Sequence, residues 1–452
     1  MPDKYDVIVI GGGPGGLEAA QRTAEAGKHV LIIEKIGWGG TCTHRGCIPT
    51  KALLACSGHY ADLKKIKRMG VNVTSAAFDF SAMKKHQQQM VSISALGSQK
   101  ILKDAGVETR FGTGEIISPQ EVQFTDQSGK SEILSTNSIV IAWGSEPQIL
   151  PGINLSDHIL TSDGILSLNT LPQSIFIVGG SFIGIEFATF FAELGVKVTL
   201  IELLNHILPQ EDEDVSTFLQ QELIRAGVAV HSPTQLINIQ ETDSNVAIEA
   251  KKYSEKMEWN ADYALLCTGR KPLLNEAELI NAGIKYDRKG IKVDENMMTT
   301  VPAIYAVGDV TGGMLLAHRA AQQGKVAAAH ICNYEATSYN ENFIPAIVYS
   351  HPQVARVGLT ESQAKSAGLN IDVVKSAYSA NIIARTELAG QGFAKAIFYQ
   401  DKLIGLTIAG IHASELISSM SLAMSGNLSR KQMQSWVIPH PTLSEIFSSI
   451  IY

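Results

Sequence analysis

Short runs of consecutive apolar residues alternate along the chain with stretches in which apolar positions recur at helical spacing. The apolar run at 7–10 leads into a glycine-rich segment at 11–16 and then into a helical pattern at 17–26. A second apolar run at 30–33 ends at Glu34. Continuous apolar runs are typical of strands that are buried on both faces of a parallel sheet. The pattern therefore predicts one strand–turn–helix–strand unit.

The same pattern returns 168 positions later without a gap. The apolar run at 175–178 corresponds to the first strand, and Gly179 and Gly184 correspond to the first and last glycines of the turn. Glu202 takes the place of the acid that closes the second strand. Two such βαβ units predict two doubly wound, Rossmann-like parallel sheets in one chain.

Both glycine turns have the residues that dinucleotide binding needs. The first glycine permits the tight turn, the second lets the backbone approach a pyrophosphate, and the third lets helix and strand pack closely. The pyrophosphate then lies at a helix N-terminus, where unpaired N–H groups favour anions. An acid 23 positions after the first glycine can bind a ribose 2′-hydroxyl. In the first copy these residues are Gly11, Gly13, Gly16 and Glu34.

The second copy departs from this pattern at one position, where Ser181 replaces the middle glycine. Its hydroxymethyl group would either hold the cofactor back or donate a hydrogen bond to phosphate. Glu202 would repel the 2′-phosphate of NADP, and no Arg or Lys follows it at 203–206, so NAD is favoured. Two dinucleotide sites suggest one bound flavin and one exchanging nicotinamide, and Asp309, after an apolar run, is placed to reach a flavin hydroxyl.

Cys42 and Cys47 form a pair with redox spacing. They are a weak metal signal, because no second Cys/His pair lies nearby to complete four ligands, and we predict no metal site. Pro49 suits an early helical position and 51–60 has a helical pattern, so Cys47 is expected near a helix N-terminus. That position favours the thiolate, and Cys42 can close a disulfide with it.

The segment 39–51 resembles the active-site signature of the flavoprotein disulfide reductases, which include lipoamide, glutathione and mercuric types. The resemblance implies that Cys42 exchanges with the substrate and that Cys47 lies against FAD. It also implies that Lys51 lies beside the flavin and pairs with Glu186.

Near the C-terminus, His440 stands five residues before Glu445. Unaided, such a pair is usually a surface pair. The resemblance implies that His440 takes the proton of the substrate dithiol, is held by Glu445, and reaches the disulfide of the other subunit of a homodimer. It further implies FAD contacts at Gly114 and Ala317 and an NAD contact at Gly269.

Among these types the resemblance favours lipoamide, and hence oxidation of dihydrolipoamide by NAD⁺. Mercuric and thioredoxin types carry a redox pair at the C-terminus, which this chain lacks, and Glu202 opposes the NADP of glutathione types. A 2-oxoacid dehydrogenase complex is the expected assembly. Two alternatives stay open. One is an NAD(P)H-dependent reductase of another disulfide, of glutathione-like or mercuric type. The other is a structural subunit or redox sensor in such an assembly.

Several positions depart from the lipoamide pattern and lie close to the expected disulfide, flavin or interface. They are Thr43-His44-Arg45 between the cysteines, Trp143 in place of Thr, and Gln322-Gln323 in place of acids.

Composition and charge argue against several classes of protein. A net charge of −7 argues against a nucleic-acid partner. No secretory signal precedes the first strand, and five cysteines are too few for a disulfide scaffold. The stretch 175–192 is apolar, but Glu186 and the glycine break favour a buried strand, turn and helix over a membrane span. We expect a soluble, cytoplasmic protein.

The expected fold is α/β, with two doubly wound nucleotide-binding domains and a C-terminal α+β dimerisation domain. An FAD-binding domain at 1–150 is completed by 271–341. It is interrupted by an NAD-binding domain at 151–270, and the dimerisation domain takes 342–452.

Overall fold

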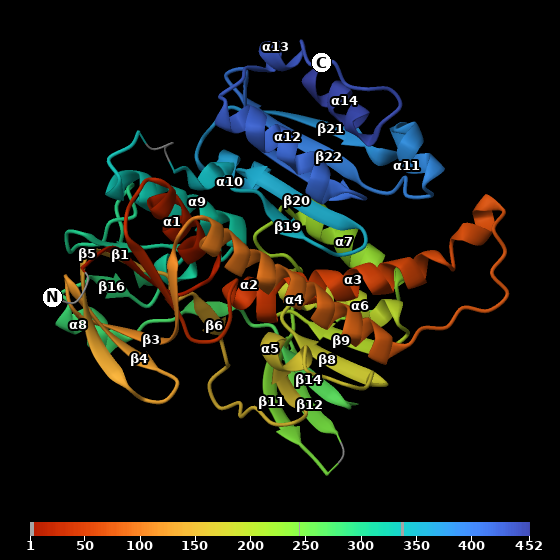
Figure 1. Ribbon diagram of the computed structural model, residues 1–452. Helices are drawn as coiled ribbons and strands as arrows, with labels where there is room; N and C mark the ends of the chain where they lie inside the picture. The colour runs from red at the N-terminus through yellow and green to blue at the C-terminus, as the bar shows by residue number, and fades with distance from the viewer. Residues whose placement is uncertain (1–3, 244, 336–338) are drawn as a thin grey trace. The chain divides into compact units, whose positions relative to one another are not determined.

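The computed structural model describes residues 4–243, 245–335 and 339–452 (Figure 1). The chain forms two compact units, each assembled from three segments. The first unit contains Met1–Ala52, Lys85–Gln148 and Gly269–Glu341. The second contains Leu53–Lys84, Ile149–Thr268 and Asn342–Tyr452.

The first unit is built on a parallel sheet whose central strand is β1. Its order is β3 (Glu108–Ser118), β2 (Val30–Glu34), β1 (Tyr5–Ile10), β5 (Ser131–Ile141) and β18 (Ile304–Ala306), with β4 (Glu121–Asp126) antiparallel between β3 and β5. Val7, Ile8 and Val9 have no exposed surface. Both faces of β1 are therefore buried, as its unbroken apolar run predicts.

Two helices of the first unit cross closely over this sheet. They are α1 (Pro14–Glu25) and α9 (Ala317–Ile331). A Cβ on Gly324 would lie 2.4 Å from the carbonyl oxygen of Gly15, so the glycine is needed for the close approach. Helix α1 begins three residues earlier than the pattern suggests, because Pro14 has the backbone angle that a first helical turn requires.

The second unit contains another parallel sheet, and one of its strands leads into the second glycine turn. Its order is β10 (Ala229–His231), β9 (Lys197–Ile201), β8 (Ser174–Val178), β14 (Tyr263–Leu266) and β7 (Ile159–Thr161). The apolar stretch predicted as strand, turn and helix is β8, the turn and α6 (Phe182–Glu193). Within the described residues, no helix combines the length and apolar character needed to cross a membrane.

The C-terminal part of the second unit is an antiparallel sheet. Its order is β19 (Ala346–Val348), β20 (Gln353–Gly358), β23 (Lys402–Gly410), β22 (Phe393–Tyr399) and β21 (Asp372–Ala377). Helix α12 (Ala413–Ser425) packs on β20 and β23, and Figure 1 shows it against this sheet. The predicted fold class, two nucleotide-binding sheets and a C-terminal α+β part, is confirmed.

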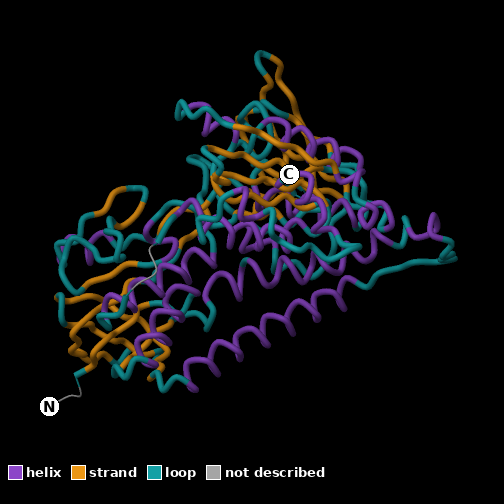
Figure 2. The backbone as a smooth tube through the Cα atoms, turned by 90° about the horizontal axis from the view of Figure 1, so that it is seen from above, coloured by secondary structure: helices purple, strands orange, loops and turns teal. Residues whose placement is uncertain are grey.

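Two further helices are long, α3 (Cys47–Asp62) and α4 (Phe80–Asp104), and Figure 2 shows the helical parts of the chain in purple. The remaining α-helices and β-strands complete the two units. They are α2 (Gly40–Arg45), β6 (Ser145–Pro147), α5 (Ser162–Ile165), α7 (Glu213–Arg225), β11 (Gln235–Glu241), β12 (Val246–Lys252), β13 (Glu255–Ala261), β15 (Arg270–Pro272), α8 (Glu276–Asn281), β16 (Tyr286–Asp287), β17 (Gly290–Ile291), α10 (Glu361–Ser366), α11 (Ile382–Thr386), α13 (Arg430–Met433) and α14 (Ser448–Ile451).

The two predicted FAD stretches fall mainly in the first unit, whereas the NAD and C-terminal stretches fall mainly in the second. The bounds of these four stretches stay a prediction. Residues 1–3, 244 and 336–338, which those domains include, lie outside the described residues.

Candidate active site

The first glycine turn joins β1 to α1 and leaves room for a ligand. Gly11 has φ +114°, and a Cβ there would lie 2.2 Å from the carbonyl oxygen of Ala142. A Cβ on Gly16 would lie 2.0 Å from the carbonyl oxygen of Gly11. At Gly13, the N-cap of α1, no described heavy atom lies within 4 Å of such a Cβ. The turn is therefore closed on the protein side and open at a helix N-terminus, which fits a dinucleotide pyrophosphate.

Glu34 at the end of β2 is buried and shapes this turn. Its Oε2 accepts from the N–H of Gly12 at 2.6 Å, and its Oε1 accepts from the N–H of Ile36 at 2.6 Å. The sequence predicts Glu34 as a ribose ligand. Its second task, tying the glycine turn to the loop after β2, has no sequence signal, although lone pairs of the carboxylate remain for a hydroxyl.

The second glycine turn repeats this geometry. Gly179 has φ +109°, and a Cβ on Gly184 would lie 2.0 Å from the carbonyl oxygen of Gly179. Glu202 accepts from the N–H of Gly180 at 2.8 Å and from the N–H of Leu204 at 2.8 Å.

Ser181 takes the place that Gly13 has in the first turn. It is the N-cap of α6 with φ −95° and ψ −171°, close to the φ −75° and ψ 178° of Gly13. Its side chain makes no capping hydrogen bond to α6 in the part of the chain that the structure describes. The serine is therefore accommodated without a change of backbone conformation.

Asp309 follows β18 and belongs to a short polar chain. It accepts from the hydroxyl of Ser145 at 2.6 Å, and that hydroxyl accepts from Nε of Arg270 at 2.9 Å. Burial raises the pKa of Asp309, while the Ser145 hydrogen bond opposes the rise. No local pattern of the sequence connects Ser145 or Arg270 to Asp309, because both lie far from it along the chain.

The other predicted cofactor residues lie on a strand, a helix and a turn of the first unit. Gly114 is on β3, where a Cβ would lie 3.0 Å from Cδ1 of Ile33. Ala317 is the first residue of α9. Gly269 has φ +104° and its carbonyl oxygen accepts from the N–H of Gln148 at 2.9 Å.

The cysteine pair lies at the junction of α2 and α3. Cys42 is within α2, and Cys47 is the first residue of α3, so the predicted helix start is confirmed. All five cysteines carry thiols, and Cys42 is hydrogen-bonded to Cys47. This bond, followed by burial, raises the pKa of the Cys42 thiol. Cys42 therefore keeps its proton at neutral pH and needs a base to lose it.

The unusual residues between the cysteines hold α2 in place. The hydroxyls of Thr43 and Ser94 share a hydrogen bond of 3.1 Å, and Nε2 of His44 donates to the carbonyl oxygen of Trp38 at 3.1 Å. A carbonyl only accepts, so Nε2 carries the proton. Contacts within the first unit thus account for Thr43 and His44.

Lys51 lies on the first turns of α3, in the same unit as both cysteines. Glu186 belongs to the second unit. It is buried on α6 and accepts from the N–H of Tyr349 at 3.1 Å.

His440 and Glu445 are brought together as predicted. Nδ1 of His440 lies 2.7 Å from Oε1 of Glu445, and the histidine side chain is 76% exposed. The hydrogen bond from His440 lowers the pKa of Glu445, and a bond from the N–H of Thr442 adds to it. The carboxylate thus orients the imidazole through Nδ1, while most of the ring stays exposed.

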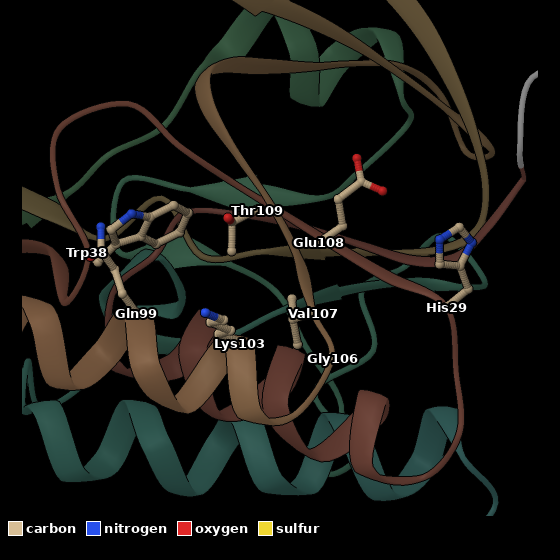
Figure 3. Close-up of a pocket in the computed structure, with 8 residues that line it drawn as sticks. All are labelled: His29, Trp38, Gln99, Lys103, Gly106, Val107, Glu108 and Thr109. Atoms are coloured by element: carbon tan, nitrogen blue, oxygen red, sulfur yellow. The ribbon is translucent and has the colours of Figure 1, made fainter.

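No cluster of three or more metal-ligating side chains occurs among the described residues. The first unit also holds a cavity of about 580 Å³ (Figure 3), lined by His29, Trp38, Gln99, Lys103, Gly106, Val107, Glu108 and Thr109. No predicted site residue lines this cavity. The lining of this cavity therefore includes neither the glycine turns nor the cysteine pair.

Comparison with known proteins identifies the family to which these glycine turns and the cysteine pair belong. Residues 5–324 match the family model described as pyridine nucleotide-disulphide oxidoreductase, and residues 344–450 match the dimerisation domain of that description. The chain is 36% identical to a dihydrolipoyl dehydrogenase of Chlamydia pneumoniae, over 99% of this chain and 96% of the relative. It is also 36% identical to a dihydrolipoyl dehydrogenase of Bacillus subtilis, over 97% and 96%.

Solved structures give the same result. The chain is similar to LpdA from Mycobacterium tuberculosis, with a TM-score of 0.92 and 26% identity over 99% of this chain and 98% of that one. It is also similar to the HOCl-induced flavoprotein disulfide reductase RclA from Escherichia coli, in a Cu(II) complex, with a TM-score of 0.87 and 27% identity over 99% of each chain.

Proposed function

Because the chain belongs to the pyridine nucleotide-disulphide oxidoreductase family, we propose that it is a dihydrolipoamide dehydrogenase, which oxidises dihydrolipoamide with NAD⁺. The observation that carries this proposal is the hydrogen-bonded pair of Cys42 and Cys47 at the start of α3. Near full-length relatives named dihydrolipoyl dehydrogenase support the substrate. Glu202 supports NAD over NADP, because its carboxylate would repel a 2′-phosphate.

The two glycine turns divide the cofactors in this proposal. The open space at Gly13 and the buried Glu34 fit FAD on the first unit, and the second turn with Glu202 fits NAD. Bound FAD and NAD⁺ supply the redox chemistry that removes an electron pair from the cysteines. The further contacts proposed are Gly11, Gly16, Gly114, Asp309 and Ala317 for FAD, and Gly179, Gly184 and Gly269 for NAD.

The cysteines exchange with the dithiol in two steps. One thiolate of dihydrolipoamide attacks Sγ of Cys42 in the disulfide form, and the sulfur of Cys47 leaves as a thiolate. The second substrate thiolate then attacks the mixed disulfide, which releases oxidised lipoamide and leaves Cys42 reduced. The substrate has lost two electrons and two protons, and the cysteine pair has gained both electrons.

These proton transfers need a base, since a thiolate and not a thiol is the nucleophile. We assign this role to His440 of the other protomer, oriented by Glu445. General-base catalysis of this kind contributes roughly 10²–10⁴-fold in rate. Lys51 and Glu186 complete the proposed site beside the flavin.

The same proposal includes the setting of the enzyme. The match of 344–450 to a dimerisation domain supports a homodimer. We further propose that the substrate is a protein-bound lipoyl group, that the enzyme serves a 2-oxoacid dehydrogenase complex, and that it is cytoplasmic. The domain bounds given above belong to the same proposal.

The experiment that tests this function is a substrate panel with purified protein. NADH formation is measured with NAD⁺ and dihydrolipoamide, and with NADP⁺ in parallel. NADPH oxidation is measured with glutathione disulfide and with Hg²⁺. Fast turnover with dihydrolipoamide and NAD⁺ alone is the expected result, and it would also argue against a purely structural or sensing role. Turnover only with another acceptor would overturn the substrate.

A further inference from the structure

The loop between β19 and β20 is tied to helix α6 at two acids of the second unit. The N–H of Tyr349 donates to Oε1 of Glu186 at 3.1 Å. Two residues later, Nδ1 of His351 lies 2.6 Å from Oε1 of Glu193. Glu186 and Glu193 are seven positions apart, which places both on one face of α6. The loop therefore follows that face for two helical turns.

Helix α3 joins the same contact from another direction. The hydroxyl of Ser57 donates to Oε2 of Glu193 at 2.5 Å, and Ser57 has no exposed surface. A Cβ on Gly58 would lie 2.6 Å from Cε1 of His351, so glycine makes room for the imidazole against α3. One carboxylate thus links α3, α6 and the loop.

This carboxylate depends on its two donors. The side chain of Glu193 is 9% exposed, and a buried carboxylate without hydrogen bonds is strongly disfavoured. A carboxylate only accepts here, so Nδ1 of His351 carries the proton whether or not the ring is charged. Hydrogen bonds to a charged group are shorter than neutral ones. The contacts of Ser57 and His351 with Glu193, at 2.5 and 2.6 Å, have such lengths. Without His351, Glu193 would keep only the hydrogen bond from Ser57 of these two.

We propose that His351 is a positioning residue for the dithiol reaction, because through Glu193 it holds the loop that fixes the carboxylate of Glu186. The inference rests on the proposed function in one respect, the role of Glu186 beside the flavin. Helix α6 begins at the second glycine turn, and Glu193, the partner of His351, is its last residue.

The test compares three variants. His351→Ala removes the donor, and His351→Asn replaces Nδ1 by an amide N–H at a similar distance from the backbone. His412→Ala is the matched control, since His412 pairs with Glu387 at 3.4 Å in an exposed His–Glu contact of the same C-terminal part. We expect kcat for dihydrolipoamide to fall about tenfold in His351→Ala, with an unchanged KM for the dithiol. His351→Asn should recover most of the loss, and His412→Ala should show none.

A second readout separates positioning from stability. The flavin midpoint potential should shift in His351→Ala, because the Glu186 carboxylate loses its fixed orientation, and should return in His351→Asn. A lower Tm with wild-type kcat and potential would make His351 merely structural and would overturn the proposal. So would equal losses in His351→Ala and His351→Asn at unchanged potential.

Two further outcomes are distinguishable. If wild-type protein does not oxidise dihydrolipoamide, the proposed function fails. The flavin midpoint potential of the variants then still tests whether His351, through Glu193, positions Glu186. If His351→Ala does not fold, Ser57→Ala removes the other donor to Glu193. It should lower kcat a few-fold; wild-type kcat and potential in Ser57→Ala would then contradict the inference.

Discussion

The two glycine units have nearly the same backbone, and they differ in where the chain goes after the acid. The first glycine has φ +114° at Gly11 and φ +109° at Gly179. In both units a Cβ on the last glycine would lie 2.0 Å from the carbonyl oxygen of the first. In both, the acid accepts a hydrogen bond from the second residue of the turn. The two glycine turns therefore share one backbone geometry and one pattern of hydrogen bonding to the acid.

The segments that follow the two acids, here called the first and the second exit, differ in chemistry. After Glu34 the chain returns to the turn, where the N–H of Gly39 donates to the carbonyl oxygen of Gly12 at 2.8 Å, and then enters α2 with its cysteine. After Glu202 the N–H of Leu208 makes the equivalent bond to Gly180 at 2.8 Å.

The second exit then leads into the acidic segment 211–214 instead of a cysteine pair. There Lys395 of β22, 1% exposed, donates to Asp212 at 2.7 Å and to Asp214 at 2.9 Å. The comparison teaches that the same nucleotide turn can be followed by a redox site or by a structural anchor, and that the segment after the acid decides which.

Alanine at the last glycine of each turn should have the largest effect and should separate the two ligands. Gly16→Ala forces a Cβ into the carbonyl of Gly11, so the purified variant should lack bound flavin. Gly184→Ala should keep its flavin but lose NAD⁺-dependent turnover. Flavin absorbance per chain and NADH formation are the measurements. Gly97→Ala in the first unit and Gly390→Ala in the second are the matched controls, because neither glycine has a positive φ and a Cβ there would meet no close contact. Loss of flavin in both turn variants would contradict the division of cofactors.

Lys395→Met should weaken the anchor of the second exit without removing flavin. It leaves Asp212 and Asp214 without their shared cation, and breaking such a buried pair costs about 3–5 kcal/mol of unfolding free energy. Denaturant unfolding measures it. Lys100→Met is the control, because its i,i+4 ion pair with Asp104 is exposed and is worth about 0.3–0.5 kcal/mol. An unfolding free energy equal to the control would show that the anchor does not stabilise the fold.

The anchor also predicts an acid limit. Burial tends to raise the pKa of Asp212, but hydrogen bonds from Lys395 and Ser362 outweigh it and lower the pKa to about 2. A depressed pKa in the folded state adds stability above the ordinary aspartate value and loses it as pH falls toward 2. Wild-type unfolding free energy should therefore decline in this acid window, and Lys395→Met should show a shallower decline.

Glu202→Ala should weaken the ribose contact of the second unit. It removes a carboxylate that also ties the turn together through Gly180 and Leu204. The KM for NAD⁺ should rise roughly tenfold, which corresponds to the loss of one charge-assisted hydrogen bond. The KM for NADP⁺ should fall relative to that for NAD⁺, since a repulsive charge is gone. A KM for NAD⁺ equal to wild type would exclude Glu202 from the binding site.

Ser181→Gly should have the smallest effect and should decide how the two turns differ. The backbone at Ser181 already matches that of Gly13, so the change removes only the hydroxymethyl group. If the hydroxyl donates to phosphate, the KM for NAD⁺ should rise about threefold. A fall in KM would mean instead that the side chain holds the cofactor back.

Local patterns predicted the elements of this site well. The glycine spacing, the acids and the helix that begins at Cys47 all follow from short-range backbone requirements, which a sequence displays directly. The contact of His440 with Glu445 needed the family resemblance, because a pair five positions apart has no local signature.

The contacts that position the site were missed because they join distant segments. Ser145 reaches Asp309 across 164 positions, and Ser57 reaches Glu193 across 136. Each is an ordinary serine within its own segment, and only the tertiary fold gives it a partner. Such contacts carry no periodicity that a sequence pattern could show.

The most direct test of the account is Cys42→Ser, measured in two assays on the same preparation. The account predicts that NAD⁺-dependent oxidation of dihydrolipoamide falls to background, because the sulfur that exchanges with the substrate is gone. NADH-driven reduction of ferricyanide should persist, because it needs only the two nucleotide units. Dithiol oxidation at the wild-type rate in Cys42→Ser would contradict the claim that electrons enter through the cysteine pair.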